Sequence, residues 1–90
     1  VIHEIAHIIL AHDDNVPDYI CEYETERWTI NYLKACNIHV DYKSDYMEYI
    51  SNARTYVKGH IERYVNFHEK RGLPLTVRKK ICKWAKYKNI

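Results

Sequence analysis

The hydrophobic positions along the chain predict four helical segments. Apolar residues lie on nearly all sides of residues 1–11, which is typical of a helix buried in a larger body, and we expect it to end near His12. Turn-forming residues at 13–17 separate it from a second helix, expected from Asp18 to Cys36. The third helix is expected from Ser44 or Asp45 to Gly72. Along it one apolar stripe recurs at alternating steps of four and three, namely Tyr46, Ile50, Ala53, Val57, Ile61, Tyr64 and His68.

A last helix is expected from Thr76, which can act as its N-terminal cap, to about Tyr87. Its apolar positions face inward, and its basic positions, Arg78, Lys79, Lys83 and Lys86, face outward. Residues 37–42 alternate in polarity and fit a short strand or a loop equally well. With only two Gly and two Pro, the chain has little material for the tight turns of an all-β fold. The sequence therefore predicts a mainly α fold with about four helices.

Composition and charge add an asymmetry to this picture. The 90 residues, 47% of them hydrophobic and 29% charged, suit one globular domain. Residues 1–30 carry seven acids and one base, a net charge of −6, whereas residues 51–90 carry eleven bases and two acids, a net charge of +9. We therefore divide the single domain, residues 1–90, into an acidic half (1–40) and a basic half (41–90). Such a division indicates either a nucleic-acid face or two halves that attract each other.

The cysteines and the hydropathy place limits on the setting. Three cysteines without a CxxC pair argue against a disulfide framework or a thiolate zinc site, so we interpret Cys21, Cys36 and Cys82 as reduced thiols. No apolar run approaches about 18 residues, and no signal peptide is recognisable. We expect a cytoplasmic protein without a membrane partner.

A candidate catalytic motif lies in the first segment. His3, Glu4 and His7 form an HExxH pattern, and the spacing of four puts both imidazoles on one face of a helix, where they can bind one Zn²⁺. Glu4 is rotated by about 100° from His3, because successive helical residues differ by that angle. It points beside the metal and can act as a general base toward water.

The third zinc ligand has several candidates. Asp13 stands where an extended HExxHxxGxxH motif has its third ligand, although Leu10 replaces the glycine of that motif. Glu22, Glu24 and Glu26 are better placed if the second helix folds back across the first. Glu22 and Glu26 share a face, so one can bind zinc while the other orients a ligand histidine. Alternatively, acids near a helix start merely complement the helix dipole.

The stretches HEIAHIILAH and EYETERWT resemble the ImmA/IrrE-type metallopeptidases of bacteria and phages, over about residues 1–35. The resemblance implies that His3, His7 and Glu22 bind Zn²⁺ and that Glu4 is the base. It implies a small zinc-dependent metallopeptidase, encoded by a phage or a bacterium, that cleaves a protein substrate. We expect a zincin-like active helix without the sheet that usually precedes it.

Two other functions remain open. The chain can be a non-catalytic interaction protein, such as a phage inhibitor of a host defence nucleoprotein complex. It can also be a small DNA-binding regulator that uses the helix expected from Thr76 to Tyr87. In both, Arg78, Lys79, Lys83 and Lys86 form the face toward nucleic acid or a protein partner, although a basic helix face is often simply solvated.

Overall fold

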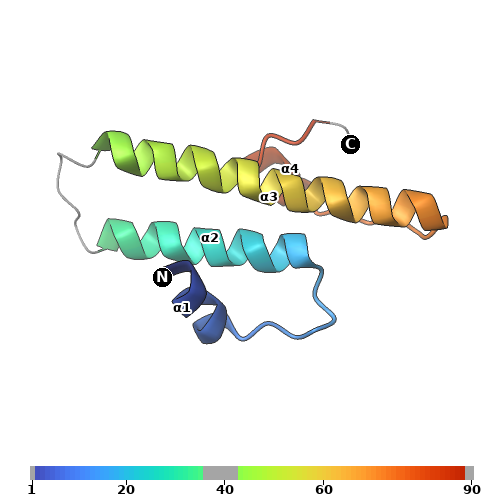
Figure 1. Cartoon of the computed structure of the whole chain (residues 1–90), viewed down its shortest axis with the longest axis horizontal. Helices are drawn as coiled ribbons and strands as arrows, with labels where there is room; N and C mark the ends of the chain where they lie inside the picture. The colour runs from blue at the N-terminus through green and yellow to red at the C-terminus, as the bar shows by residue number, and fades with distance from the viewer. Residues whose placement is uncertain (1, 36–42, 89–90) are drawn as a thin grey trace.

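The computed structural model describes residues 2–35 and 43–88, and within them it is mainly α-helical, as predicted. The helices are α1 (Ile2–Leu10), α2 (Asp18–Ala35), α3 (Lys43–Arg71) and α4 (Lys79–Trp84). The strand or loop expected at residues 37–42 lies outside the described residues, as does Cys36. The two long helices, α2 and α3, run antiparallel side by side, with α1 against α2 and α4 against α3 (Figure 1).

The main core lies between α2, α3 and α4. On α3, the predicted apolar stripe is confirmed at Ala53, Val57 and Ile61, which are buried, while the side chain of Tyr46 lies outside the described part of the chain. Burying such a stripe removes apolar surface from water, which is the main force that holds the helices together. The core cluster consists of Tyr19, Ile20, Val57, Ile61, Val65, Ile81, Cys82, Ala85 and Tyr87.

Helix α1 is not buried on all sides, so that expectation is wrong. Among residues 3–10, whose side chains the structure describes, only Ala6 is buried, whereas Ile5, Ile8 and Ile9 are 45%, 78% and 55% exposed. The reason is that α1 is packed mainly against one neighbour, α2, which covers one side of it (Figure 1). The helix also ends at Leu10 rather than near His12.

The turn after α1 is the one that the sequence predicts. Ala11 takes a left-handed conformation, with φ of 43°, that ends the helix. The backbone N–H of Asn15 then donates to a carboxylate oxygen of Asp13 (3.0 Å), and that of Val16 donates to the Asp13 carbonyl (3.0 Å). Helix α2 begins at Asp18, and the carbonyl of Pro17 accepts its first hydrogen bonds.

Helix α4 is shorter than expected and starts at Lys79, not at Thr76. Arg78 is its N-cap residue, in an extended conformation and without a side-chain capping bond. The Arg78 N–H donates instead to the hydroxyl of Tyr19 on α2 (3.1 Å), so a tertiary contact satisfies the helix start. The inward positions Ile81 and Ala85 are buried, and the four predicted basic positions are exposed, as expected: Arg78, Lys79, Lys83 and Lys86.

Helices α3 and α4 end in the same way. In each, two backbone N–H groups after the helix donate back to carbonyls of its last turn, as in a Schellman motif. The residue in the left-handed conformation is Gly72 after α3, with φ of 62°, but Lys86 after α4, with φ of 59°. A side chain is therefore tolerated at α4 where glycine is the usual choice.

Two further expectations concern the thiols and the hydropathy. Cys21 is half-buried and Cys82 is buried, and both are free thiols. Burial raises the pKa of both thiols, so neither is activated as a thiolate. Within the described residues, no helix combines the length and apolar character needed to cross a membrane.

Candidate metal centre

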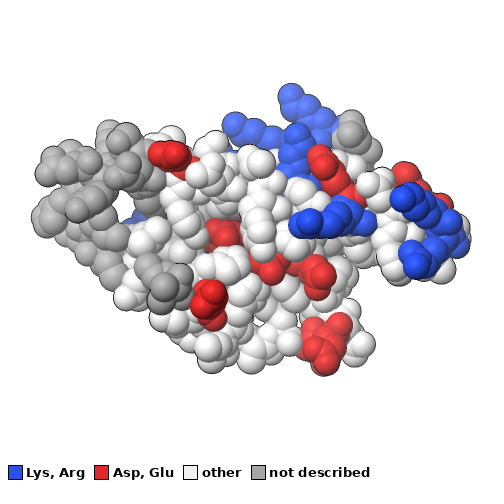
Figure 2. Space-filling view, in the orientation of Figure 1, with Lys and Arg blue, Asp and Glu red and all other residues white. Residues whose placement is uncertain are grey.

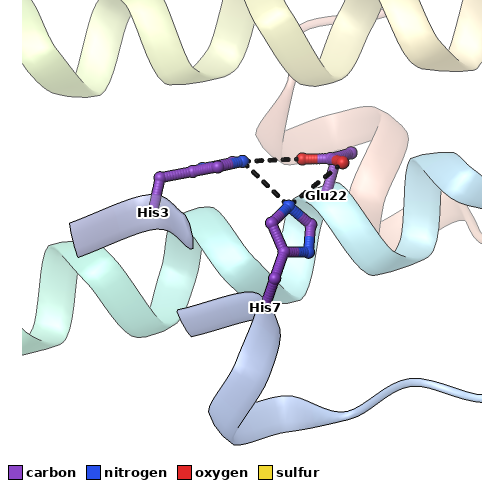
Figure 3. A group of neighbouring side chains, drawn as sticks. All are labelled: His3, His7 and Glu22. Carbon is purple, nitrogen blue, oxygen red and sulfur yellow. Dashed lines mark hydrogen bonds and ion pairs between the residues drawn. The ribbon is translucent and has the colours of Figure 1, made fainter. Parts of the chain in front are cut away.

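Helices α1 and α2 bring together the three residues that the sequence and the resemblance singled out as ligands. His3 and His7 project from consecutive turns of α1 toward Glu22 on α2 (Figure 3). The Nε2 atoms of the two histidines are 3.0 Å apart. Glu22 reaches both, with Oε2 at 3.1 Å from His3 Nε2 and Oε1 at 3.3 Å from His7 Nε2.

This triangle has the size of a zinc site. Nitrogen and oxygen ligands about 2.0–2.1 Å from zinc, at tetrahedral angles, stand about 3.3–3.4 Å from one another. The two Nε2 atoms are 3.0 Å apart and lie 3.1 and 3.3 Å from different oxygens of Glu22, and one ligand atom from each residue lies within 4.8 Å of the others. Two imidazoles and one glutamate also form a known catalytic zinc set that leaves a fourth position for water.

The Nδ1 atom of each imidazole, which faces away from the cluster, has a partner on α2. His3 Nδ1 is 2.6 Å from Oε1 of Glu26, which is 6% exposed, and the other oxygen of Glu26 accepts a 2.7 Å hydrogen bond from the Tyr49 hydroxyl. His7 Nδ1 is 3.4 Å from Oγ1 of the buried Thr25. When Nδ1–H donates to a carboxylate, Nε2 keeps its lone pair for a metal, which is the arrangement that orients ligand histidines.

One atom of this cluster lacks a hydrogen-bond partner. Glu22 Oε2 is buried and has no hydrogen-bond partner, although His3 Nε2 lies 3.1 Å away. With Glu26 at Nδ1 of His3, the lone pair of His3 Nε2 points at an anionic oxygen. A metal ion between the two atoms would satisfy both, and His7 Nε2, which lies 3.0 Å from His3 Nε2, could bind the same ion. The residues present therefore fit a divalent cation.

The other acids proposed as third ligands lie elsewhere. Glu24 is exposed on a different face of α2 and is 3.4 Å from His12 Nε2. Asp13 is exposed in the turn, where its carboxylate accepts the Asn15 N–H. Among the described residues, the only group of histidine, cysteine and acidic side chains that converges in this way is that of His3, His7 and Glu22.

Glu4 stands beside the cluster on α1 and is exposed. Within residues 2–35 and 43–88, no hydrogen bond or ion pair holds its carboxylate. A general base needs such freedom to reach a water and then a leaving group. Its catalytic role stays a prediction.

Sequence reasoning missed two tyrosines of α3. Tyr49 supports Glu26, and the ring of Tyr56 meets that of His3 edge-on at 5.8 Å between centroids. Burial raises the pKa of the Tyr56 hydroxyl, and the adjacent carboxylate of Glu22 raises it further, so the hydroxyl keeps its proton and can donate it. The two tyrosines are seven residues apart and so share a face of α3, which is the signal that could have found them.

Comparison with protein-family models, with curated proteins and with solved structures found no match to this chain.

Proposed function

We propose that this protein is a small zinc-dependent metallopeptidase that cleaves a protein substrate. The observation that carries the proposal is the closed triangle of His3, His7 and Glu22, with Glu26 behind His3 at 2.6 Å. The triangle joins an HExxH helix to a glutamate of the next helix, as the resemblance to the ImmA/IrrE-type metallopeptidases implies. A cytoplasmic setting fits the two free thiols, Cys21 and Cys82.

When bound, zinc supplies Lewis acidity, which polarises a peptide carbonyl and makes water a better nucleophile near neutral pH. Glu26 fixes the tautomer of His3, and Glu22 completes the ligand set. Glu4, which is exposed beside the ligands, takes the proton from water and returns it to the leaving amine. Tyr56 presents a protonated hydroxyl next to Glu22, where it can donate to the carbonyl oxygen as negative charge develops.

Metal analysis and one variant test this proposal. Purified protein dialysed against trace zinc is expected to retain about one zinc per chain, because three ligands are pre-arranged. A Glu4→Gln variant is expected to keep that zinc and to lose cleavage of a denatured protein substrate by a factor of about 10² or more. Glu48→Gln, which changes an exposed acid on α3, is the matched control and should retain full cleavage.

Two outcomes would contradict the proposal. Zinc well below one equivalent in the wild-type chain removes the metal centre and with it the peptidase. Zinc at one equivalent with equal cleavage by the wild type and the Glu4→Gln variant removes the role of Glu4.

A second candidate function is a non-catalytic interaction protein. The observation that favours it is the exposed apolar side of α1, formed by Ile5, Ile8 and Ile9, because exposed apolar patches often mark binding surfaces. It is distinguished by a Glu4→Gln variant that retains zinc and the whole of the phenotype that the wild-type gene confers on a cell. Loss of the phenotype in that variant supports the peptidase instead.

A further inference from the structure

A second group of charged side chains lies where α2, α3 and α4 meet. A surface pocket of about 350 Å³ is lined by seven residues from these three helices and the residues just after α4. Five of them are basic, two are aromatic, and none is acidic: Arg27, Arg54, Lys80, Lys83, Lys86, Tyr23 and Trp84. Basic side chains also gather over α4 and the end of α3 on the face shown in Figure 2, while acidic ones lie mainly over the middle and lower parts.

No carboxylate among the described residues pairs with the basic side chains of this pocket. In the part of the chain that the structure describes, every ion pair involves a histidine, and no Lys or Arg nitrogen lies within 4 Å of a carboxylate. Arg54 Nε is buried and has no hydrogen-bond partner, while its guanidinium lies over the Trp84 ring at 5.6 Å. Like charges brought together repel, and a buried donor without an acceptor is unfavourable. A bound anion would relieve both.

Lys86 contributes one of the charges of this pocket from an unusual backbone position. It occupies the left-handed position of the turn that closes α4, with φ of 59°, where glycine is preferred. At the equivalent position after α3 the chain has Gly72. A lysine in a backbone conformation that favours glycine fits a role for its ammonium group in the pocket.

We propose that this pocket binds phosphate groups carried by a nucleotide or a nucleic-acid strand. Arginine and lysine are the usual phosphate ligands. The five basic side chains of the pocket carry more positive charge than one singly charged anion would neutralise. The rings of Tyr23 and Trp84, 5.3 Å apart edge to face, form an aromatic wall that suits a nucleobase. The proposal is independent of the metal centre, because none of its residues belongs to the zinc triangle.

Binding of three probes tests it. A fluorescently labelled single strand of roughly 12 nucleotides is titrated with protein at about 50 mM salt and above, and unlabelled ATP and inorganic pyrophosphate are added as competitors. The wild type is expected to bind at least one probe with an affinity that falls as salt rises, since phosphate contacts release counterions.

Paired variants locate the site. The double variant Arg54→Gln/Lys83→Gln is expected to bind the best probe about tenfold or more weakly, with a shallower salt slope, because two phosphate contacts are lost. The control Lys70→Gln/Arg71→Gln removes the same charge at the far end of α3 and should change the affinity less than about threefold. Lys86→Gly should weaken binding while raising the melting temperature, which separates lost contacts from unfolding.

Each result decides something. Binding of the strand without competition by ATP or pyrophosphate supports a nucleic-acid source, and effective competition by either supports a free phosphate compound. Absence of binding for all three probes overturns the proposal. So does an equal loss in the two double variants, because affinity then follows net charge rather than the pocket. Zinc content measured on the same samples stays unchanged in every variant and reports separately on the metal centre.

Discussion

Helix α2 takes part in two charged sites that are built in opposite ways. On the side toward α1, Glu22 and Glu26 each lie close to an imidazole, at 3.1 Å and 2.6 Å from His3. Toward α4, Arg27 lines a pocket whose four other charged residues are all cations. The first site combines acceptors and titratable rings that a single cation completes. The second has no acidic residue in its lining, so a bound anion would complete it.

The largest expected effect comes from filling the first site. Zinc in excess over EDTA-treated protein should raise the melting temperature by about 10 °C or more, because a ligand at 100 times its dissociation constant adds about 2.7 kcal/mol to the free energy of unfolding. His7→Ala should abolish this shift. His12→Ala, which alters a histidine that pairs with Glu24 outside the triangle, should leave it intact. The measurement is differential scanning calorimetry with and without zinc, and equal shifts in both variants would sink the assignment of ligands.

A smaller effect is expected from changing Glu26, which contacts His3 at the nitrogen that faces away from the cluster. Glu26→Gln keeps the shape of the side chain but removes the negative charge from the oxygen that lies 2.6 Å from His3 Nδ1 and accepts its hydrogen bond. The zinc affinity should fall about 10- to 100-fold, as for other outer partners of ligand histidines, while the stoichiometry stays at one. Competition with a coloured zinc chelator measures this. Glu24→Gln serves as the control, and an affinity loss as large as that of Glu26→Gln would contradict the supporting role.

The smallest effects are expected at Gly59, within α3, and Gly72, just after it. At both positions the methyl group of an alanine would meet open space. Gly72→Ala should lower the free energy of unfolding by about 1 kcal/mol, because φ of 62° disfavours any side chain. Gly59→Ala, inside the helix, should raise it by roughly 0.5–1 kcal/mol through the better helix propensity of alanine. Urea denaturation of the two variants and the wild type checks the opposite signs. A destabilised Gly59→Ala variant would show that α3 is not a regular helix there.

Much of this arrangement follows from local patterns in the sequence. The apolar stripe predicts the buried face of α3, because residues that recur at steps of three and four lie on one side of a helix with 3.6 residues per turn. A spacing of four places His3 and His7 on one face of the first helix, and the same spacing places Glu22 and Glu26 on one face of the second. The separation of Glu22 from Glu24 follows in the same way. These inferences need only the geometry of single helices.

Tertiary contacts decide the remaining features. At the start of α4 the Arg78 N–H donates to the Tyr19 hydroxyl, and the sequence around Thr76 gives no sign of this contact. Arg27, Arg54 and Lys83 come from three helices, so their meeting depends on how these helices pack. The charge division of the chain suggested either attraction between its halves or a nucleic-acid face. In the described ranges no Lys or Arg forms an ion pair, so no ion pair joins the two halves there.

The neighbouring positions of these residues on α2 have an electrical consequence. Glu22 and Tyr23, like Glu26 and Arg27, are adjacent in sequence, so both sites use the same turns of α2, on faces about 100° apart. Charges on neighbouring faces of one helix are only partly screened, because the Debye length at physiological ionic strength is about 8 Å. A divalent ion bound by His3, His7 and Glu22 would offset the nearby carboxylates and would make the basic pocket more attractive to anions. By thermodynamic linkage, an anion in the pocket would then tighten metal binding by the same factor.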